Sequence, residues 1–178
     1  MVIVAETPRL RIRHFTLDDA PFILRLLNEP SFIENIADKG VRTLDAARDY
    51  LASGPIKSYE KHGFGLNCVD LKDTLVPIGM CGLIKRDTLE DPDLGYAYLP
   101  EHWAKGYALE AASEMMTKAG GHFGMTRVVA ITSAENDRSI RLLERLGFRY
   151  ERRVALGEDP EEIKLFAWTP EVSAEGAR

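Results

Sequence analysis

Two segments of the chain combine residue types and spacings that could do chemistry. The first is Trp103-Ala-Lys-Gly-Tyr-Ala108, which follows a strand pattern and enters a helix near Gly106. The N-terminus of a helix presents unpaired backbone N–H groups and a partial positive charge, which suit a diphosphate. Gly106 and Ala108 allow a ligand to approach closely, and Lys105 adds a cation. An ordinary strand-to-helix turn would use the same residues, so both interpretations stay open on this segment alone.

The second segment begins at Asn136, after a β-branched strand pattern, and ends at Gly147-Phe148. Asn136 suits the N-cap of a helix, and Ser139 lies nearly one turn later on the same face. Between residues 127 and 153 the chain holds seven arginines and four acidic residues. A local basic surface in an acidic protein fits a phosphate-bearing cofactor, and a solvated charged face is the alternative.

Length and composition predict one soluble domain. The chain has 178 residues, of which 45% are hydrophobic and 29% are charged, so it can bury a substantial core. Its net charge of -5 argues against a general nucleic-acid binder. No apolar run approaches the roughly 18 residues that cross a bilayer, and the stretch at 2–5 is too short for a signal peptide. We therefore expect a cytoplasmic protein that contacts neither membrane nor nucleic acid, with Cys68 and Cys81 as buried free thiols.

Motifs of several common enzyme classes are missing from the sequence. It has no Gly-x-x-x-x-Gly-Lys-Ser/Thr phosphate loop, no His-Glu-x-x-His zinc helix and no Gly-x-Ser-x-Gly nucleophile turn. The four histidines and two cysteines show no metal-ligand spacing. Each absence lowers the weight of one enzyme class, and we expect no metal site.

The elements that must position these segments follow from the apolar periodicity, which predicts one α/β (α+β) domain. Strand patterns occupy residues 9–14, 64–70, 77–85, 93–99, 127–132, 150–156 and 162–168. Helical spacing occupies residues 18–30, 43–54, 106–123 and 136–146. We expect a loop at 31–42, a helix N-cap at Asp18, and a helix end at Gly54-Pro55. The domain spans 1–170, and the tail at 171–178 is expected to fray.

Together the two segments resemble those of the GNAT superfamily of acyl-CoA-dependent N-acetyltransferases. Trp103-Ala-Lys-Gly-Tyr-Ala108 stands in the place of the family's glycine-rich Arg/Gln-x-x-Gly-x-Gly/Ala signature. Asn136, Ser139 and Gly147-Phe148 match the family's Asn-x-x-Ser/Ala…Gly-Phe helix. The segment Glu6-Thr-Pro-Arg-Leu-Arg-Ile-Arg13 is similar to the branch that contains the ribosomal-protein N-terminal (alanine/serine) acetyltransferases.

The resemblance covers about residues 6–168 and implies a single GNAT-like domain. Such a domain has a mixed, mostly antiparallel sheet with a central splayed parallel strand pair and about four helices. The resemblance also implies acetyl-CoA as the cofactor and direct attack of a primary amine on the thioester. Backbone groups near Tyr98 and Leu99 would bind pantetheine and polarise the thioester carbonyl. The residues implied to bind the cofactor are Tyr98, Leu99, Ala104, Lys105, Gly106, Tyr107, Ala108 and Asn136.

Catalytic groups are less clearly marked than the cofactor site. Trp103 and Ala104 replace the usual Arg or Gln and a frequent Gly, and Leu143 stands where many relatives carry a Tyr general acid. A thiolate with a reference pKa of about 8.5 leaves readily near neutrality, so help from an acid is useful rather than obligatory. Ser139 is a candidate proton relay, with a packing hydroxyl as its alternative. Glu101 is a candidate base, with a surface charge as its alternative.

The acceptor is expected to be a primary amine, either a peptide N-terminus or a small amine. Without a convincing base, amines of low pKa are favoured and water is expected to take the proton. Asp93 and Glu90 are further candidate bases, each with a surface charge or strand cap as the alternative. Residues 35–43, the turn after Gly54 and residues 85–93 are expected to rim the acceptor cleft. The acidic 85–93 connection suits a cationic acceptor, unless its charges are simply solvated.

Two rival functions stay open from the sequence. One is a non-catalytic acyl-CoA-binding regulatory module, which the missing Tyr and the absent base favour. The other is a structural α/β interaction domain that binds no cofactor. The edge of the last strand pair also leaves a homodimer open.

Overall fold

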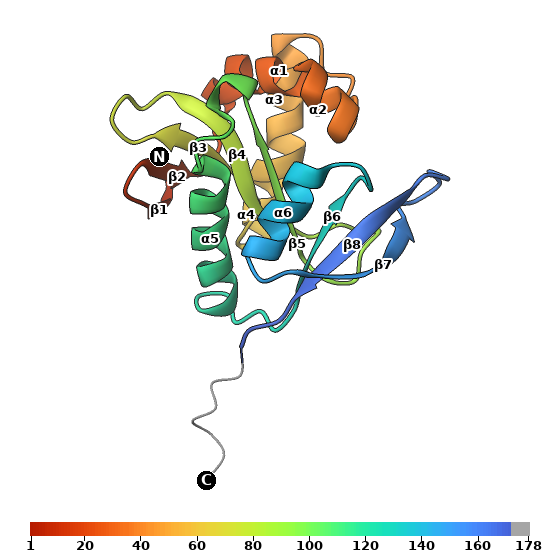
Figure 1. Cartoon of the computed structure of the whole chain (residues 1–178). Coiled ribbons are helices and arrows are strands. Elements are labelled where there is room, and N and C mark those ends of the chain that lie inside the picture. Colours follow the sequence, from red (N-terminus) through yellow and green to blue (C-terminus); the bar gives the residue numbers. More distant parts are fainter. Residues whose placement is uncertain (172–178) are drawn as a thin grey trace.

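Eight strands form one sheet within residues 1–171, the part of the chain that the structure, a computed structural model, describes. Their order across the sheet is β1-β2-β3-β4-β5-β6-β8-β7 (Figure 1). The strands are β1 (Ile3–Glu6), β2 (Leu10–Arg13), β3 (Leu66–Leu71), β4 (Pro77–Ile84), β5 (Asp93–Tyr98), β6 (Val128–Thr132), β7 (Arg149–Ala155) and β8 (Glu162–Trp168). The helices are α1 (Ala20–Leu27), α2 (Pro30–Asn35), α3 (Leu44–Leu51), α4 (Lys57–His62), α5 (Tyr107–Gly120) and α6 (Asp137–Arg145).

The strands β5 and β6 run parallel, whereas the other neighbouring strands of the described sheet are antiparallel. The parallel pair meets at one position, where Asp93 lies opposite Val129. The Val129 N–H donates there to the Pro92 carbonyl at 2.9 Å. Towards their carboxyl ends the two strands pair no further, so they diverge as a fork. The predicted mixed sheet with a central splayed parallel pair is confirmed.

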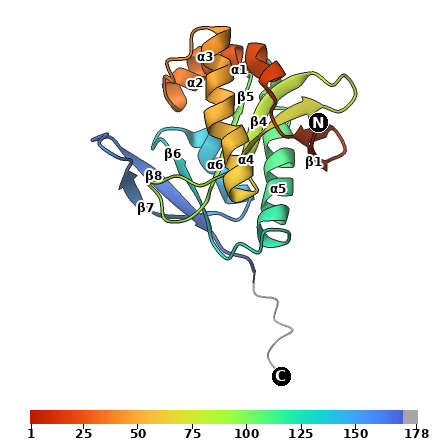
Figure 2. The same ribbon diagram turned by 180° about the vertical axis from the view of Figure 1, so that it is seen from behind.

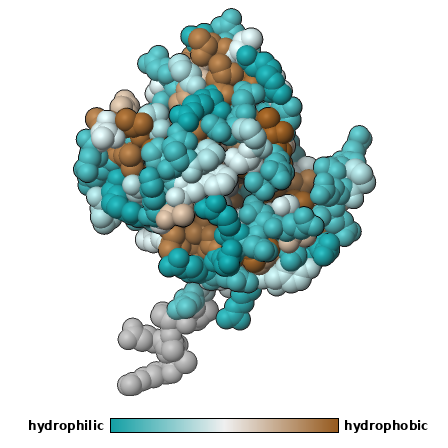
Figure 3. Space-filling view, turned by 45° about the horizontal axis from the view of Figure 1, so that its top comes forward, coloured by the Kyte–Doolittle hydropathy of each residue, from teal (hydrophilic) through white to brown (hydrophobic). Residues whose placement is uncertain are grey.

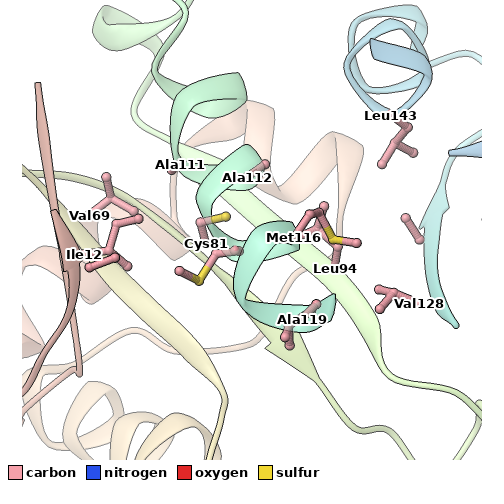
Figure 4. Close-up of a cluster of buried hydrophobic side chains, with 14 of the residues drawn as sticks. Ile12, Val69, Cys81, Leu94, Ala111, Ala112, Met116, Ala119, Val128 and Leu143 are labelled. Atoms are coloured by element: carbon pink, nitrogen blue, oxygen red, sulfur yellow. The ribbon is translucent and has the colours of Figure 1, made fainter. Parts of the chain in front are cut away.

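Helices cover both faces of this sheet. In Figures 1 and 2, α5 and α6 lie on one face, and α1 to α4 lie on the other. A buried cluster under α5 and α6 includes Cys81, Ala111, Val128 and Leu143 (Figure 4). A second cluster joins α1, α2 and α3 to the opposite face. Since side chains alternate along a strand, β3 and β4 supply residues to both clusters. The sheet with its fork lies between the two helical layers.

A buried ion-pair network ties β2 to β3 and to the turn before α1. The Arg13 guanidinium contacts both oxygens of Asp19 at 2.9 Å. It also donates from Nε to Asp70 Oδ2 at 2.8 Å. Asp70 is fully buried, and Arg11 provides its second cation at 2.6 Å. Removing one partner of such a network would leave an uncompensated buried charge, so its role is to fix the N-terminal strands.

More of the chain before β3 is helical than the sequence predicted. The expected loop at 31–42 contains most of α2, because Pro30 begins that helix; its fixed φ and missing N–H suit a first turn. The expected helix end at Gly54-Pro55 is also wrong. The chain continues through a π turn at Ala52–Ile56 into α4, which stops at Gly63 with a φ of 78°.

Smaller differences lie near the chain's N-terminus. β1 was not predicted, and it pairs with β2 through an irregular register. A short 3-10 turn at Leu17–Asp19 precedes α1. Asp19, rather than the expected Asp18, is the N-cap residue of α1, and its side chain does not cap that helix. Its carboxylate accepts the Thr16 N–H at 2.9 Å and so caps the 3-10 turn. Both cysteines are free and buried, as expected. The tail expected to fray comprises residues 171–178, and all of these except residue 171 lie outside the described residues.

Within residues 1–171, no helix is both long enough and apolar enough to cross a bilayer. On the face drawn in Figure 3, hydrophobic residues form separate patches between hydrophilic ones.

Candidate functional site

A groove with a volume of about 1720 Å³ includes the fork between β5 and β6. Its walls also come from the turn before α5, the start of α6, and segments around α2, α3 and α4. On the β4 side of β5, the Leu99 N–H donates to the Ile78 carbonyl at 2.9 Å. Because backbone groups alternate between the two edges of a strand, the peptide groups of Tyr96 and Tyr98 face β6 instead. Where β6 diverges, they become available to an extended ligand.

The turn before α5 presents a row of unpaired backbone N–H groups. Within the described residues, the N–H groups of 104–109 donate to no protein acceptor, and the first one paired is that of Glu110, with the Gly106 carbonyl at 3.1 Å. Gly106 has a φ of 81° and Ala104 a φ of 59°. The left-handed conformation costs a residue with a Cβ of the order of 1 kcal/mol or more, so the turn holds Ala104 under strain. Unpaired N–H groups at a helix N-terminus bind anions.

Arg9, just before β2, holds this turn in place. Its Nε donates to Glu110 Oε2 at 2.7 Å, and its Nη1 donates to the Lys105 carbonyl at 2.8 Å. The guanidinium also lies 4.5 Å from the centre of the Tyr107 ring. Glu110 in turn accepts the Thr7 hydroxyl at 2.6 Å. The N-terminal segment therefore buttresses the first turn of α5, a role that the sequence analysis did not assign.

Trp103 joins the turn to the end of β5. Its indole N–H donates to the Tyr98 carbonyl at 2.9 Å. Of the two Tyr98 backbone groups that face the fork, the N–H therefore remains unpaired among the described residues. The Arg138 guanidinium of α6 stacks on the Trp103 ring at 4.5 Å. Both side chains line the groove. The departure from the family's Arg or Gln thus replaces one polar side chain by an indole that braces the strand.

Ser139 lies on α6 and faces Tyr96 across the groove. Their hydroxyl oxygens are 2.6 Å apart, and either one can be the donor. Burial raises the pKa of Tyr96 to about 12, so its hydroxyl stays protonated at neutral pH. The sequence analysis singled out Ser139 but missed Tyr96. The alternation of β5 could have found it, because Leu94, Tyr96 and Tyr98 share one strand face.

The remaining α6 residues have structural positions. Asn136 caps the helix, because its side chain accepts the Ser139 N–H at 3.3 Å, and it also lines the groove. Leu143 is 1% exposed and packs in the core cluster with Phe148, so that position supplies no polar group to the groove.

Glu101 lies in a 3-10 turn at Pro100–His102 and is exposed. Its carboxylate forms an ion pair with Arg25 of α1. A backbone hydrogen bond and the Arg25 guanidinium lower the pKa of Glu101. The groove lining formed by the described residues does not include it. The structure therefore does not bring Glu101 together with Ser139, and its role as a base stays a prediction.

Asp93 is the buried carboxylate of the fork. It is 0% exposed, so the interpretation as a surface charge is wrong. Its Oδ1 accepts the Arg86 Nε–H at 2.9 Å, while Oδ2 is buried without a hydrogen-bond partner among the described residues. Burial raises the pKa of Asp93, against the opposing effect of the Arg86 charge. A buried carboxylate with a raised pKa is suited to accept a proton.

Metal ligation is not apparent at this site. No group of three or more His, Cys, Asp or Glu side chains within residues 1–171 is arranged to hold a metal ion. The groove instead offers free peptide groups, a protonated tyrosine hydroxyl and a buried carboxylate, which together suit binding of an anionic, extended ligand and proton transfer.

A comparison with protein families matches most of the chain. A family model described as "Acetyltransferase (GNAT) domain" matches residues 9–149. That range contains the fork, the turn before α5 and α6. It ends in β7, so the last strand pair lies largely outside it.

Known proteins are similar over most of the chain. "Uncharacterized N-acetyltransferase YoaA" from Bacillus subtilis (strain 168) is 27% identical over 153 residues, 85% of each chain. The crystal structure of an acetyltransferase from Agrobacterium tumefaciens str. C58 superposes with a TM-score of 0.79 at 23% identity, covering 93% of this chain and 94% of that one. The coenzyme A complex of RimL, a ribosomal L7/L12 alpha-N-protein acetyltransferase, has a TM-score of 0.80 at 15% identity, covering 94% and 97%. At these identities the two structures show a shared fold.

Proposed function

The chain belongs to the GNAT acetyltransferase family, and we propose that it transfers the acetyl group of acetyl-CoA to a primary amine, either a peptide N-terminus or a small amine. The observation that carries this proposal is the row of unpaired N–H groups at 104–109 beside the fork of β5 and β6. The similarity to RimL, a ribosomal L7/L12 alpha-N-protein acetyltransferase, supports a peptide N-terminus as the acceptor.

The residues present fit acetyl-CoA. The free N–H groups of the turn before α5 would hold the diphosphate, and the left-handed Gly106 leaves its backbone open to close approach. The peptide groups of Tyr96 and Tyr98 that face the fork would hold the pantetheine arm. When bound, the cofactor supplies an activated thioester. A backbone N–H directed at the thioester carbonyl would stabilise the negative charge that develops on its oxygen.

Tyr96 is suited to protonate the departing thiolate. Its hydroxyl is held by Ser139 at 2.6 Å and is protonated at neutral pH, since burial raises the pKa of Tyr96 to about 12. A thiol has a reference pKa of about 8.5, so the thiolate leaves without full protonation and the contribution of the acid is moderate. In this proposal Ser139 orients the Tyr96 hydroxyl rather than carrying a proton on its own.

Asp93 is suited to receive the proton of the acceptor ammonium group through a water molecule. An α-amine with a pKa of about 8 needs roughly 1.4 kcal/mol for deprotonation at pH 7, whereas a lysine near 10.4 needs about 4.6 kcal/mol. The raised pKa of Asp93 brings it closer to the pKa of the amine, but the carboxylate stays the weaker base. Amines of low pKa are therefore the favoured acceptors, with Asp93 as the final proton acceptor.

The test is an acceptor screen that measures CoA release from acetyl-CoA with N-terminal peptides, lysine peptides and small amines. Amine-dependent CoA release is the expected result. Tight acetyl-CoA binding in a thermal-shift assay without release by any amine would instead establish the rival function, a non-catalytic acyl-CoA-binding module. Absence of both binding and turnover would overturn the cofactor site itself.

A further inference from the structure

The residues that line the groove include polar side chains from three segments outside the turn before α5. Lys39 comes from the segment after α2, Tyr50 from α3, and Arg86 from the connection between β4 and β5. All three line the groove. None belongs to the turn before α5, so these side chains are separate from the proposed diphosphate position.

Arg86 is fixed in place with most of its donors unused. Its Nε donates to Asp93 Oδ1 at 2.9 Å, and its side chain is 33% exposed. Its two Nη groups donate to no acceptor within residues 1–171. A guanidinium anchored through Nε keeps a planar edge of N–H groups that matches a carboxylate or phosphate.

Lys39 adds a second cation that no carboxylate neutralises. Its neighbour Asp38 is paired with Arg42 at 2.7 Å, and no described carboxylate lies within ion-pair distance of Lys39. Desolvation and the positive charge of Arg86 lower the pKa of Lys39. Burial raises the pKa of the Tyr50 hydroxyl, which the same Arg86 charge opposes. The charge of Arg86 therefore affects the pKa values of both Lys39 and Tyr50.

Acidic residues also line the groove or belong to the 85–93 connection, and some of them are paired with arginines while others are exposed. In the 85–93 connection, Asp91 is paired with Arg127 at 2.9 Å and Asp93 with Arg86. Glu34 and Asp87 also line the groove, but both are exposed, where solvent and salt weaken their field. The connection also holds the exposed Glu90, so its expected match to a cationic acceptor stays a prediction, which the acceptor comparison below tests.

We propose that Arg86, Lys39 and the Tyr50 hydroxyl, which line the same groove, form a subsite for an anionic group that the acceptor amine itself carries. The acceptor class is then a primary amine bearing a carboxylate or phosphate, rather than a polyamine or another polycation. This inference rests on the proposed acetyl transfer and specifies its acceptor. Asp93 links the two functions, because its carboxylate anchors Arg86 and lies at the fork.

The test compares matched acceptors in the CoA-release assay. The pairs are β-alanine with β-alaninamide, aminoethylphosphonate with ethanolamine, and a peptide with Asp at its second position with the Asn version. We expect the anionic member to have a kcat/KM at least tenfold higher in one or more pairs, and the preferred pair distinguishes a carboxylate, a phosphate-like group and an acidic peptide. Equal rates within all three pairs would overturn the inference.

Variants of Lys39 complete the test, since its side chain is exposed, although nearby groups partly desolvate its ammonium group, and it lies outside the proposed proton path. K39Q should lower kcat/KM for the anionic acceptor about tenfold. It should change kcat/KM for the matched neutral acceptor by less than twofold and leave KM for acetyl-CoA unchanged. K39E should lower kcat/KM for the anionic acceptor further. K61Q is the matched control, because Lys61 is also exposed and lines the same groove. An equal loss for both members of a pair, or an equal effect of K61Q, would contradict the subsite. If no amine releases CoA, the proposed function fails together with this inference. If amines release CoA but the anionic and neutral members of each pair react equally well, this inference alone is refuted.

Discussion

Replacing Arg9 with alanine tests whether the N-terminal segment holds the turn before α5, which is proposed to bind the cofactor diphosphate. Arg9 contacts Glu110 at 2.7 Å and the Lys105 carbonyl at 2.8 Å, and it stacks on Tyr107. Its side chain is 46% exposed, so each polar contact contributes only about 0.2–1 kcal/mol to folding. Together with the cation–π contact, the loss of stability should be about 1–2 kcal/mol, which lowers Tm by a few degrees in a chain of this size.

The effect on the cofactor should be larger than this modest loss of stability implies. Arg9 restrains the turn that holds Ala104 at a φ of 59°, and without it the strained residue can relax and misalign the free N–H groups. We expect KM for acetyl-CoA to rise about tenfold, corresponding to roughly 1.4 kcal/mol. kcat and KM for the amine should stay within twofold, because Arg9 contacts neither the proton donor nor the acceptor end.

The assay is steady-state CoA release with each substrate varied in turn, beside thermal unfolding of every variant. R48A is the matched control: Arg48 pairs with Asp45 at 2.9 Å and is 48% exposed, but it lies on α3 away from the turn. R9K keeps the charge near Glu110 and should recover part of the affinity. If R9A and R48A have the same KM for acetyl-CoA, or if R9A loses kcat rather than affinity, the reasoning about the turn is refuted.

Four further outcomes are expected. G106A should destabilise the fold by about 1–2 kcal/mol in thermal unfolding, because φ is 81° and a new Cβ would lie 3.2 Å from Arg9 Nη2. Y96F should lower kcat about ten- to a hundredfold with KM for acetyl-CoA within twofold, measured against S139A, whose loss should be smaller. The wild-type kcat/KM should fall as pH drops through the Asp93 pKa, which burial places above its ordinary value, and D93N should remove that limb from the pH profile. Desolvation lowers the pKa of His14, which stacks on Tyr59 at 3.7 Å. Its contribution to stability is therefore fully present above pH 6.5 and is lost as the pH falls through its lowered pKa. The urea midpoints of unfolding at pH 8 and pH 5.5 should differ less in H14Q than in the wild type.

The sequence by itself determined the turn before α5 and the order of strands and helices around it. These features depend on local chemistry: Gly106 takes a left-handed conformation, Asn136 caps its helix, and alternating patterns mark β2 and β5. Local signals were weaker where proline has two uses. Pro30 and Pro55 read as helix ends, yet the first begins α2 and the second lies inside a π turn.

Only the tertiary structure decided which side chains meet at the groove. Asp93 is a surface charge or a buried carboxylate depending on what packs over it, and the sequence contains no record of that packing. The pairs Tyr96 with Ser139, Arg9 with Glu110, and Arg86 with Asp93 join residues 43, 101 and 7 positions apart. Contacts between distant positions depend on how strands register and how helices pack. Local propensity therefore defined the proposed anion-binding turn, whereas the groups proposed to transfer protons and to bind the acceptor became recognisable from the folded chain.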